Sequence, residues 1–442
     1  MKKIFPILLS LVLLASCQPK IKEFSVTSGS ANFKKYIAVG NSLFAGFADG
    51  ALYHSAQQNS IPNLIAGQLK LAGSGTFIQP VVTSEYGVNY PGSYPRLKLG
   101  YVTDCSGAIS LGPVPYIGQK DPLAQLGYKV DNIGIPGAKS FHLLIPGYAL
   151  LNPYYYRFAT SLTAKVVDEI PPLNATFFTL WLGDNDVLSY AQTGGVGDTI
   201  TSPAFFQTAM GGVLQALTAN GAKGVIATIP DVTVIPFFTT IPYNGLVLTR
   251  QSLVDSVNYF MDSVYHVSLS QKYHLGQNPF LVDDPSSPHP YFKVRMMKEG
   301  ELVLLTVPQD SLKCGGMGLI SKYKLTPWPI PNQYVLTTDE IQKTQAATLE
   351  YNQIIQGLAT HFDLGVVDMN TKLGDLEKGI AWDGVHLNTT FVSGGAFSLD
   401  GLHLTSLGNA FAANFIIEAI NNKFASTIPY IDVSKYHGVL LP

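Results

Sequence analysis

Two short motifs near the ends of the chain carry a serine, an aspartate and a histidine that could act together. Gly40-Asn41-Ser42-Leu43 follows an apolar segment, and Asp400-Gly401-Leu402-His403 precedes another apolar stretch. A serine hydroxyl is a weak nucleophile near neutral pH, so it needs an imidazole to take its proton and a third group to orient that imidazole. Because Asp400 stands three residues before His403, its carboxylate can turn back onto Nδ1 and leave Nε2 free for Ser42. The two motifs therefore predict a serine nucleophile with a histidine base.

Two further segments offer hydrogen-bond donors for such a reaction. Attack on an ester creates an oxyanion, which must be met by donors already aimed at it. In Asn132-Ile133-Gly134-Ile135-Pro136-Gly137-Ala138, Gly137 has no Cβ, so its N–H can come close to a substrate. In Leu182-Gly183-Asp184-Asn185-Asp186, Asn185 carries a side-chain amide. The expected oxyanion hole combines Gly137, Asn185 and the backbone N–H of Ser42.

The elements that must position these residues form an α/β pattern. Short, nearly continuous apolar segments alternate with helical or looped stretches, which is typical of a parallel sheet covered on both faces. The five expected strands span 36–39, 129–133, 176–182, 224–229 and 365–368. Ligands bind beyond the carboxyl ends of such strands, and Ser42, Gly137 and Asn185 follow three of them in the sequence.

Helices are predicted from start signals and periodicity. One begins at Ser60 with Pro62 in its first turn, and others are expected within 203–219, 337–361 and 405–423. Thr337 and Glu340 have the spacing of a capping box. Two long excursions, at about 73–127 and 230–331, interrupt the alternation, and the second is expected to contain a hairpin of 291–297 with 301–307. The sequence favours a single domain over 31–442 that carries both insertions.

These segments together resemble the SGNH, or GDSL-type, hydrolase family. Its four blocks occur in family order, as Ala38-Val39-Gly40-Asn41-Ser42-Leu43, the segment 132–138, the segment 182–186 and Asp400-Gly401-Leu402-His403-Leu404-Thr405 with Gly408 following. The resemblance implies a flavodoxin-like three-layer sandwich and an esterase or lipase with Ser42, His403 and Asp400 as its triad. It matches Gly137 and Asn185 to the oxyanion glycine and asparagine.

Two features depart from the family pattern. Asn41 stands where the family name has Asp, beside the nucleophile but outside the triad. Asp383-Gly384-Val385-His386 repeats the Asp-x-x-His spacing 17 residues before Asp400; we prefer Asp400 and His403 because Thr405 and Gly408 lead into an apolar helix. Each motif also has a structural explanation, since Gly-Asn-Ser suits a turn into a helix and Asn185 could cap one.

The N-terminus resembles a lipoprotein export signal. Lys2-Lys3 precede the apolar segment 4–14, which is too short to span a bilayer, and Leu14-Ala15-Ser16-Cys17 resembles a lipobox. We expect residues 1–16 to be removed, Cys17 to be lipidated, and 17–30 to tether the enzyme to the cell envelope. An ordinary cleavable signal is the alternative. In an exported chain Cys105 and Cys314 could form a disulfide, or both could be free, buried cysteines.

Composition excludes several other functions. Only 13% of the 442 residues are charged and the net charge is −2, so no basic field attracts nucleic acid. The chain has no Gly-x-Ser-x-Gly elbow, phosphate loop or His-Glu-x-x-His helix, and no metal or cofactor is implied. The sequence therefore predicts an esterase acting on acyl lipids or acetylated glycans. A non-catalytic glycan- or lipid-binding lipoprotein and an acyltransferase remain the alternatives.

Overall fold

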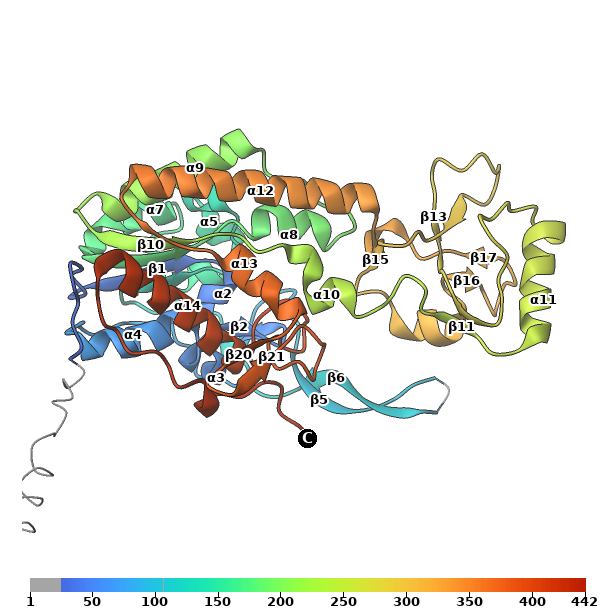
Figure 1. The fold of residues 1–442 in the computed structure, drawn as a ribbon, viewed down its shortest axis with the longest axis horizontal. Coiled ribbons are helices and arrows are strands. Elements are labelled where there is room, and N and C mark those ends of the chain that lie inside the picture. Colours follow the sequence, from blue (N-terminus) through green and yellow to red (C-terminus); the bar gives the residue numbers. More distant parts are fainter. Residues whose placement is uncertain (1–24, 106) are drawn as a thin grey trace, which may run out of the picture.

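The computed structural model describes residues 25–105 and 107–442 and has a parallel sheet at its centre (Figure 1). From one edge to the other the strands are β19 (Gly365–Val367), β10 (Lys223–Ala227), β9 (Phe177–Trp181), β1 (Tyr36–Gly40) and β8 (Asn132–Gly134). Every neighbouring pair is parallel. The predicted α/β class and the five-stranded parallel sheet are confirmed.

The strand order creates a natural binding crevice. Numbered along the chain, these five strands lie in the order 2-1-3-4-5, which is the flavodoxin-like arrangement. β1 pairs with β8 on one side and with β9 on the other, from Tyr36 opposite Phe177 to Gly40 opposite Trp181. The order of connection reverses at β1, and ligands bind beyond the carboxyl ends of the strands at such a switch point.

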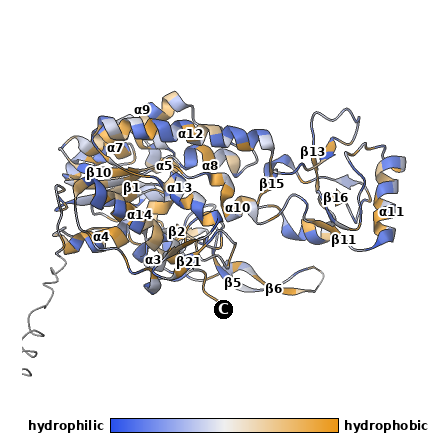
Figure 2. Ribbon diagram, viewed as in Figure 1, coloured by the Kyte–Doolittle hydropathy of each residue, from blue (hydrophilic) through white to orange (hydrophobic). Residues whose placement is uncertain are grey.

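Helices cover both faces of the sheet. α4 (Ile61–Leu71) and α14 (Ser406–Phe424) pack on one face, and α9 (Pro203–Thr218) and α12 (Thr338–His361) on the other (Figure 1). The outer helices α9 and α12 carry both hydrophilic and hydrophobic residues (Figure 2). α14 is buried almost throughout, because the C-terminal segment crosses its outer side and Asn414 exchanges hydrogen bonds of 2.7 and 3.0 Å with the backbone of Ile431.

The predicted start of α12 is confirmed in detail. The N–H of Glu340 donates to Thr337 Oγ1 at 3.4 Å, and the N–H of Thr337 donates to Glu340 Oε2 at 2.8 Å. This reciprocal capping box satisfies two backbone donors that the first turn would leave unpaired. The helix therefore begins where the sequence places it.

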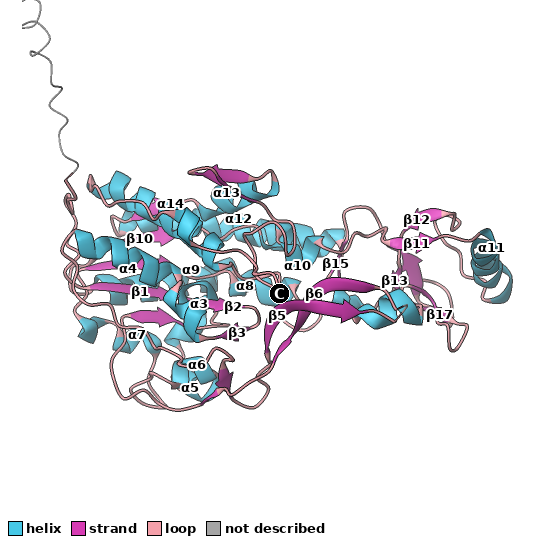
Figure 3. Cartoon of the chain, turned by 90° about the horizontal axis from the view of Figure 1, so that it is seen from below, coloured by secondary structure: helices cyan, strands magenta, loops and turns pink. Residues whose placement is uncertain are grey.

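The first excursion forms a long two-stranded ribbon. β5 (Arg96–Thr103) pairs antiparallel with β6 (Ile109–Tyr116), and the shorter strands β4 (Val88–Asn89) and β7 (Asp121–Pro122) pair beside it. The ribbon leaves the core in the same direction as the second excursion (Figures 1 and 3). Tyr101 and Ile109 are 74% and 69% exposed on it, so the ribbon does not fold onto the central core.

The second excursion has its own small hydrophobic clusters. Its elements are α10 (Pro236–Thr239), β11 (Leu246–Leu248), α11 (Gln251–Tyr259), β12 (Gly276–Asn278), β13 (Leu281–Asp283), β14 (Val294–Met296), β15 (Leu302–Val303), β16 (Leu319–Ile320), β17 (Pro327–Trp328) and β18 (Val335–Leu336). Leu281 and Met296 belong to one cluster, and Val282 and Ile330 to another. This part of the chain therefore packs largely on itself beyond the end of the sheet (Figure 1).

The hairpin predicted within this excursion is wrong. β14 pairs with β13, and β15 pairs with β18. The turn between them does form, since the N–H of Glu301 donates to the carbonyl of Lys298 at 3.2 Å and the Glu301 carboxylate holds Arg295 through two bonds of 2.8 Å. The turn signal is therefore correct, but each short strand finds its partner farther along the chain.

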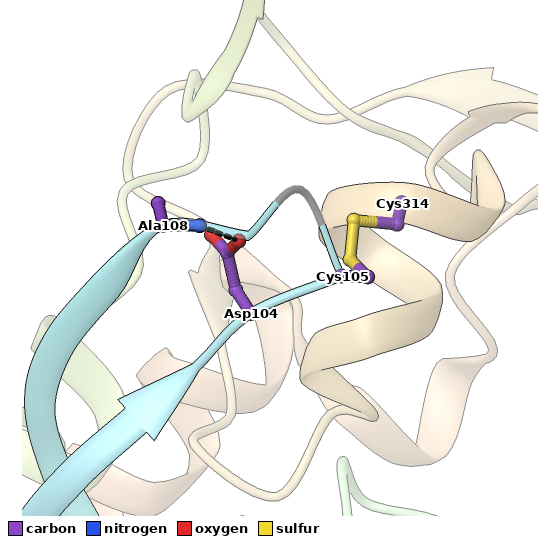
Figure 4. The surroundings of a disulfide bond; sticks show 4 residues. All are labelled: Asp104, Cys105, Ala108 and Cys314. Carbon is purple, nitrogen blue, oxygen red and sulfur yellow. Dashed lines mark hydrogen bonds between the residues drawn. A yellow bond between two sulfur atoms is a disulfide. The ribbon is translucent and has the colours of Figure 1, made fainter.

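A disulfide joins the two excursions. Cys105, at the tip of the ribbon, bonds to Cys314 in the short helix Ser311–Gly315 of the second excursion (Figure 4). Their Cα atoms are 6.1 Å apart, and the cysteines are separated by 209 residues in the sequence. The question that the sequence left open is thereby answered in favour of a bond.

The predicted export signal and the lipidation site at Cys17 lie outside the described residues. Within the part of the chain that the structure describes, each helix is too short or too polar to cross a membrane.

Candidate active site

Three of the predicted site residues follow strands at the switch point. Ser42 is the first residue of α2 (Ser42–Ala45), directly beyond β1. Asn185 is the first residue of α8 (Asn185–Ala191), beyond β9, and Gly137 follows β8. Because these three strands are parallel neighbours, their carboxyl ends meet at the same edge of the sheet. The sheet therefore brings together segments that are far apart in the sequence.

Asn41 holds the turn on which Ser42 lies. Its Oδ1 accepts the N–H of Leu43 at 3.0 Å, which caps the first turn of α2. Ser42 itself is 8% exposed. The preceding Gly40 lies so close to β9 that an added Cβ would be 2.6 Å from the carbonyl oxygen of Trp181, so only glycine fits there. The serine is thus fixed at the end of the sheet by a cap and a close backbone contact.

The turn of residues 398–403 orients the imidazole of His403. Its Nδ1 lies 2.8 Å from Asp400 Oδ2. An ionised carboxylate only accepts hydrogen bonds, so Nδ1 carries the proton and Nε2 is left to accept one. The N–H groups of Leu402 and His403 each donate to Asp400 Oδ1 at 2.9 Å. The carboxylate is therefore anchored by the same turn that presents the ring.

Further donors surround the Asp400 carboxylate. Gly50 N–H donates to Oδ2 at 2.9 Å and the Ser398 hydroxyl donates to Oδ1 at 3.0 Å. Burial alone would raise the pKa of Asp400, but the charge of His403 and the hydrogen bonds from His403 and Leu402 outweigh it, and the pKa falls to about 2. Asp400 is therefore ionised under ordinary conditions.

Ser42, Asn185 and His403 line one cavity of about 50 Å³. Its other walls are mostly apolar, and include Leu43, Leu188, Val232, Ile235, Leu373, Phe397, Leu402 and Leu404. Among the described residues, no hydrogen bond joins Ser42 Oγ to His403. A larger cavity of about 690 Å³ lies between the base of the ribbon and the C-terminal tail, but these three residues do not line it.

Asn185 is linked to the segment of Gly137 through Ala138, the residue that follows Gly137. Asn185 Nδ2 donates one hydrogen bond to the carbonyl of Ala138 at 2.9 Å, which leaves its second N–H free for a ligand. Gly137 is exposed and has a φ of +76°, with open space where a Cβ would stand. Gly137 does not line the cavity itself, but its segment is joined to Asn185 by the bond to Ala138.

The second Asp-x-x-His motif lies elsewhere. Asp383 and Gly384 form the turn between β20 (Ile380–Trp382) and β21 (Val385–Leu387), both with positive φ. Asp383 and His386 are exposed, and neither lines the cavity. The spacing there is that of a tight hairpin turn, whereas at 400–403 it brings a carboxylate onto a ring.

Sequence reasoning did not identify Asp184 as a site residue. Asp184 is buried beside Asn185, and its Oδ2 accepts a hydrogen bond from Asn41 Nδ2 at 2.6 Å. The only signal in the sequence is the amide of Asn41 beside Ser42, and it does not indicate a partner. The connection between Asp184 and Asn41 depends on β1 and β9 being neighbours, which the sequence does not state.

The second excursion contacts the 398–403 turn directly, and the ribbon is linked to it through Asp49. At the base of the ribbon, Leu97 N–H donates to the carbonyl of Asp49 at 2.8 Å, and Asp49 Oδ1 accepts the N–H of Leu399 at 3.0 Å. From the second excursion, Phe237 N–H donates to the carbonyl of Gly401 at 3.0 Å. The turn that carries His403 is therefore held directly by the second excursion and, through Asp49, by the base of the ribbon.

Comparison with known proteins gives the following. No family model and no curated protein sequence matches the chain. Among solved structures, it is similar to a lipase/acylhydrolase from Enterococcus faecalis (11% identity, TM-score 0.33, covering 90% of this chain and 100% of that one). It is also similar to a protein described as a GDSL-like lipase from Parabacteroides merdae ATCC 43184 (10%, 0.34, 89% and 99%) and to an acetyl xylan esterase (14%, 0.28, 66% and 81%).

Proposed function

We propose that this protein is a serine esterase that hydrolyses carboxylic esters through an acyl-enzyme. The observation that carries the proposal is the cavity lined by Ser42, Asn185 and His403, with the ring of His403 oriented by the buried carboxylate of Asp400. A nucleophile, a base with a fixed tautomer and an oxyanion donor are the parts that acyl transfer requires.

In the proposed reaction, Ser42 Oγ forms a bond to the ester carbonyl carbon while His403 Nε2 takes its proton. The oxyanion accepts hydrogen bonds from Ser42 N–H, Gly137 N–H and the free N–H of Asn185. As the bond to the alcohol oxygen breaks, His403 returns its proton to that oxygen. Water, deprotonated by His403, then attacks the acyl carbon. The bond from that carbon to Ser42 Oγ breaks as His403 returns the proton to Oγ, and the acid is released. Asp400 remains ionised throughout and stabilises the imidazolium that forms twice per cycle.

The size of the cavity favours short acyl groups. A volume of about 50 Å³ holds roughly three or four water-sized groups, and its walls are mostly apolar. An acetyl or slightly longer acyl group fits there, whereas a long chain would need an extension of the cavity. We therefore favour esters of short acids, such as acetylated glycans, over long-chain lipids. We further propose that lipidation at Cys17 anchors the enzyme in the cell envelope.

The test is hydrolysis of p-nitrophenyl esters from acetate to palmitate by the wild type and Ser42→Ala. The proposal expects activity that is highest on the shortest esters and is lost in the variant. Equal activity of both proteins would refute the serine mechanism. Activity that depends on Ser42 but increases with chain length would refute only the short-acyl preference.

A further inference from the structure

One buried carboxylate that lines the candidate active-site cavity, that of Asp184, has no role in the reaction described above, and its partner Asn41 lines the same cavity. Asp184 is 5% exposed and Asn41, its partner, is 1% exposed. Asn41 Nδ2 donates to Asp184 Oδ2 at 2.6 Å. Each of these residues directly precedes a group of the proposed machinery, since Asn41 stands before Ser42 and Asp184 before Asn185.

Helix capping does not account for Asp184. It occupies the N-cap position of α8, where an aspartate side chain would ordinarily accept a backbone N–H. Here the side chain makes no such bond, and the carboxylate is turned to Asn41 on the neighbouring turn instead. Asn41 does cap α2, but with Oδ1 only, so its amide N–H is available to Asp184. The pair therefore connects two turns rather than completing either one.

The arrangement is costly for the fold. Asp184 Oδ1 has no hydrogen-bond partner in the described residues, and neither has the indole Nε1 of Trp181. The indole is near enough to favour the ionised carboxylate, yet outside hydrogen-bond geometry. Burial nonetheless dominates and raises the pKa of Asp184 to about 6. Incompletely satisfied buried polar groups destabilise a protein, and such groups are retained chiefly where function requires them.

We propose that Asp184 is a positioning residue, which acts through Asn41 to fix the turn carrying Ser42 against the turn carrying Asn185. The nucleophile and the oxyanion donor come from different strands, β1 and β9, and their separation must be correct to within a fraction of an ångström. The short Asn41–Asp184 bond is a direct side-chain link between the two turns. This role rests on the proposed esterase function.

The exchange of the two side chains tests the proposal. Wild type, Asp184→Asn, Asn41→Asp and the double variant Asn41→Asp/Asp184→Asn are compared in kcat and KM on a short p-nitrophenyl ester. In the double variant the carboxylate introduced at position 41 can still cap α2 and accept a bond from the amide introduced at position 184. The proposal expects Asn41→Asp, which places two carboxylates against each other, to lose about 10- to 100-fold in kcat with little change in KM. Asp184→Asn should lose less, because its carbonyl oxygen can still accept the Asn41 N–H. The double variant should recover most of the loss caused by Asn41→Asp.

Urea unfolding of the same four proteins provides a measurement that does not depend on activity. The proposal expects the two substitutions to be strongly non-additive in unfolding free energy, because the residues are in contact. Additive effects would overturn the link between the turns. Ser42-dependent activity that is unchanged in both single variants would overturn the positioning role while leaving the esterase intact. Absence of any wild-type esterase activity would overturn the proposed function and this role with it.

Discussion

Replacing Asp400 by Asn isolates the part of the site that orients His403. The wild-type carboxylate accepts five hydrogen bonds, three at Oδ1 and two at Oδ2. Asn can satisfy the donors at Oδ1 with its carbonyl oxygen, but its NH₂ group then faces Gly50 N–H and His403 Nδ1. The ring must give up the proton on Nδ1 and carry it on Nε2, where it can no longer accept the proton of Ser42.

The expected magnitude is large for activity and moderate for stability. Substituting Asn for the orienting Asp of a serine triad lowers kcat by about 10⁴ because it selects the wrong tautomer. The pKa of Asp400 is lowered from 3.8 to about 2, which corresponds to about 2 kcal/mol of stabilisation by the ionised form at neutral pH. We therefore expect Asp400→Asn to lose about 10³–10⁴ in kcat and about 2 kcal/mol in unfolding free energy.

The assay is steady-state hydrolysis of p-nitrophenyl acetate, with urea unfolding of the same samples. Asp383→Asn is the matched control, since Asp383 has the same Asp-x-x-His spacing but is exposed on a hairpin turn. The control should keep wild-type kcat and stability. An Asp400→Asn enzyme within about tenfold of wild type, or a comparable loss in the control, would refute the assignment of the orienting carboxylate.

Three other predictions follow from the same contacts. Asn185→Ala should lower kcat by about 10²–10³, and a kcat unchanged in steady-state assays would remove Asn185 from the oxyanion hole. Cys105→Ser and Cys314→Ser should each lower the unfolding free energy, by at most about 5 kcal/mol for a loop of 209 residues. In urea unfolding, the double variant should have the same unfolding free energy as either single variant. An additive loss would contradict the disulfide. In wild type, the stabilisation of the fold by ionised Asp400 is complete above about pH 4 and is lost as pH falls toward 2. Asp184 has the opposite effect: because its pKa is raised to about 6, its ionisation destabilises the fold as pH rises from 4 to 6. Asp184→Asn should therefore gain about 2 kcal/mol relative to wild type between pH 4 and pH 7, and an unchanged difference in urea unfolding would refute the raised pKa.

Local signals in the sequence predicted the elements well. The capping box of Thr337 and Glu340 fixes the start of α12, and the buried apolar segments become the five strands of the sheet. Boundaries depended on contacts outside each segment. The second strand was expected over 129–133 but spans Asn132–Gly134. At its start, the N–H groups of Asp131 and Asn132 both donate to the carbonyl of Ile78, at 2.7 and 3.2 Å. Partners distant in sequence set the limits that propensity alone could not.

The candidate site divides in the same way. That Ser42, Asn185 and the Asp400–His403 pair belong to one site could be predicted, because residue types and short spacings indicate it. Asp184 could not, because its significance depends on β1 and β9 being neighbours. The disulfide could not be predicted either, since two cysteines separated by 209 residues carry no local signal for pairing. Interactions that require the tertiary fold emerged only from the structure.

The proposed reaction requires that Ser42 is a nucleophile activated by His403. Its most direct test is labelling with diisopropyl fluorophosphate, in which the serine oxygen bonds to phosphorus and fluoride leaves, followed by peptide mass mapping. We expect one phosphoryl group per chain, on the peptide that contains Ser42, with no labelling of Ser42→Ala and much slower labelling of His403→Ala. Labelling at another residue, or labelling of Ser42 at the wild-type rate in His403→Ala, would contradict it.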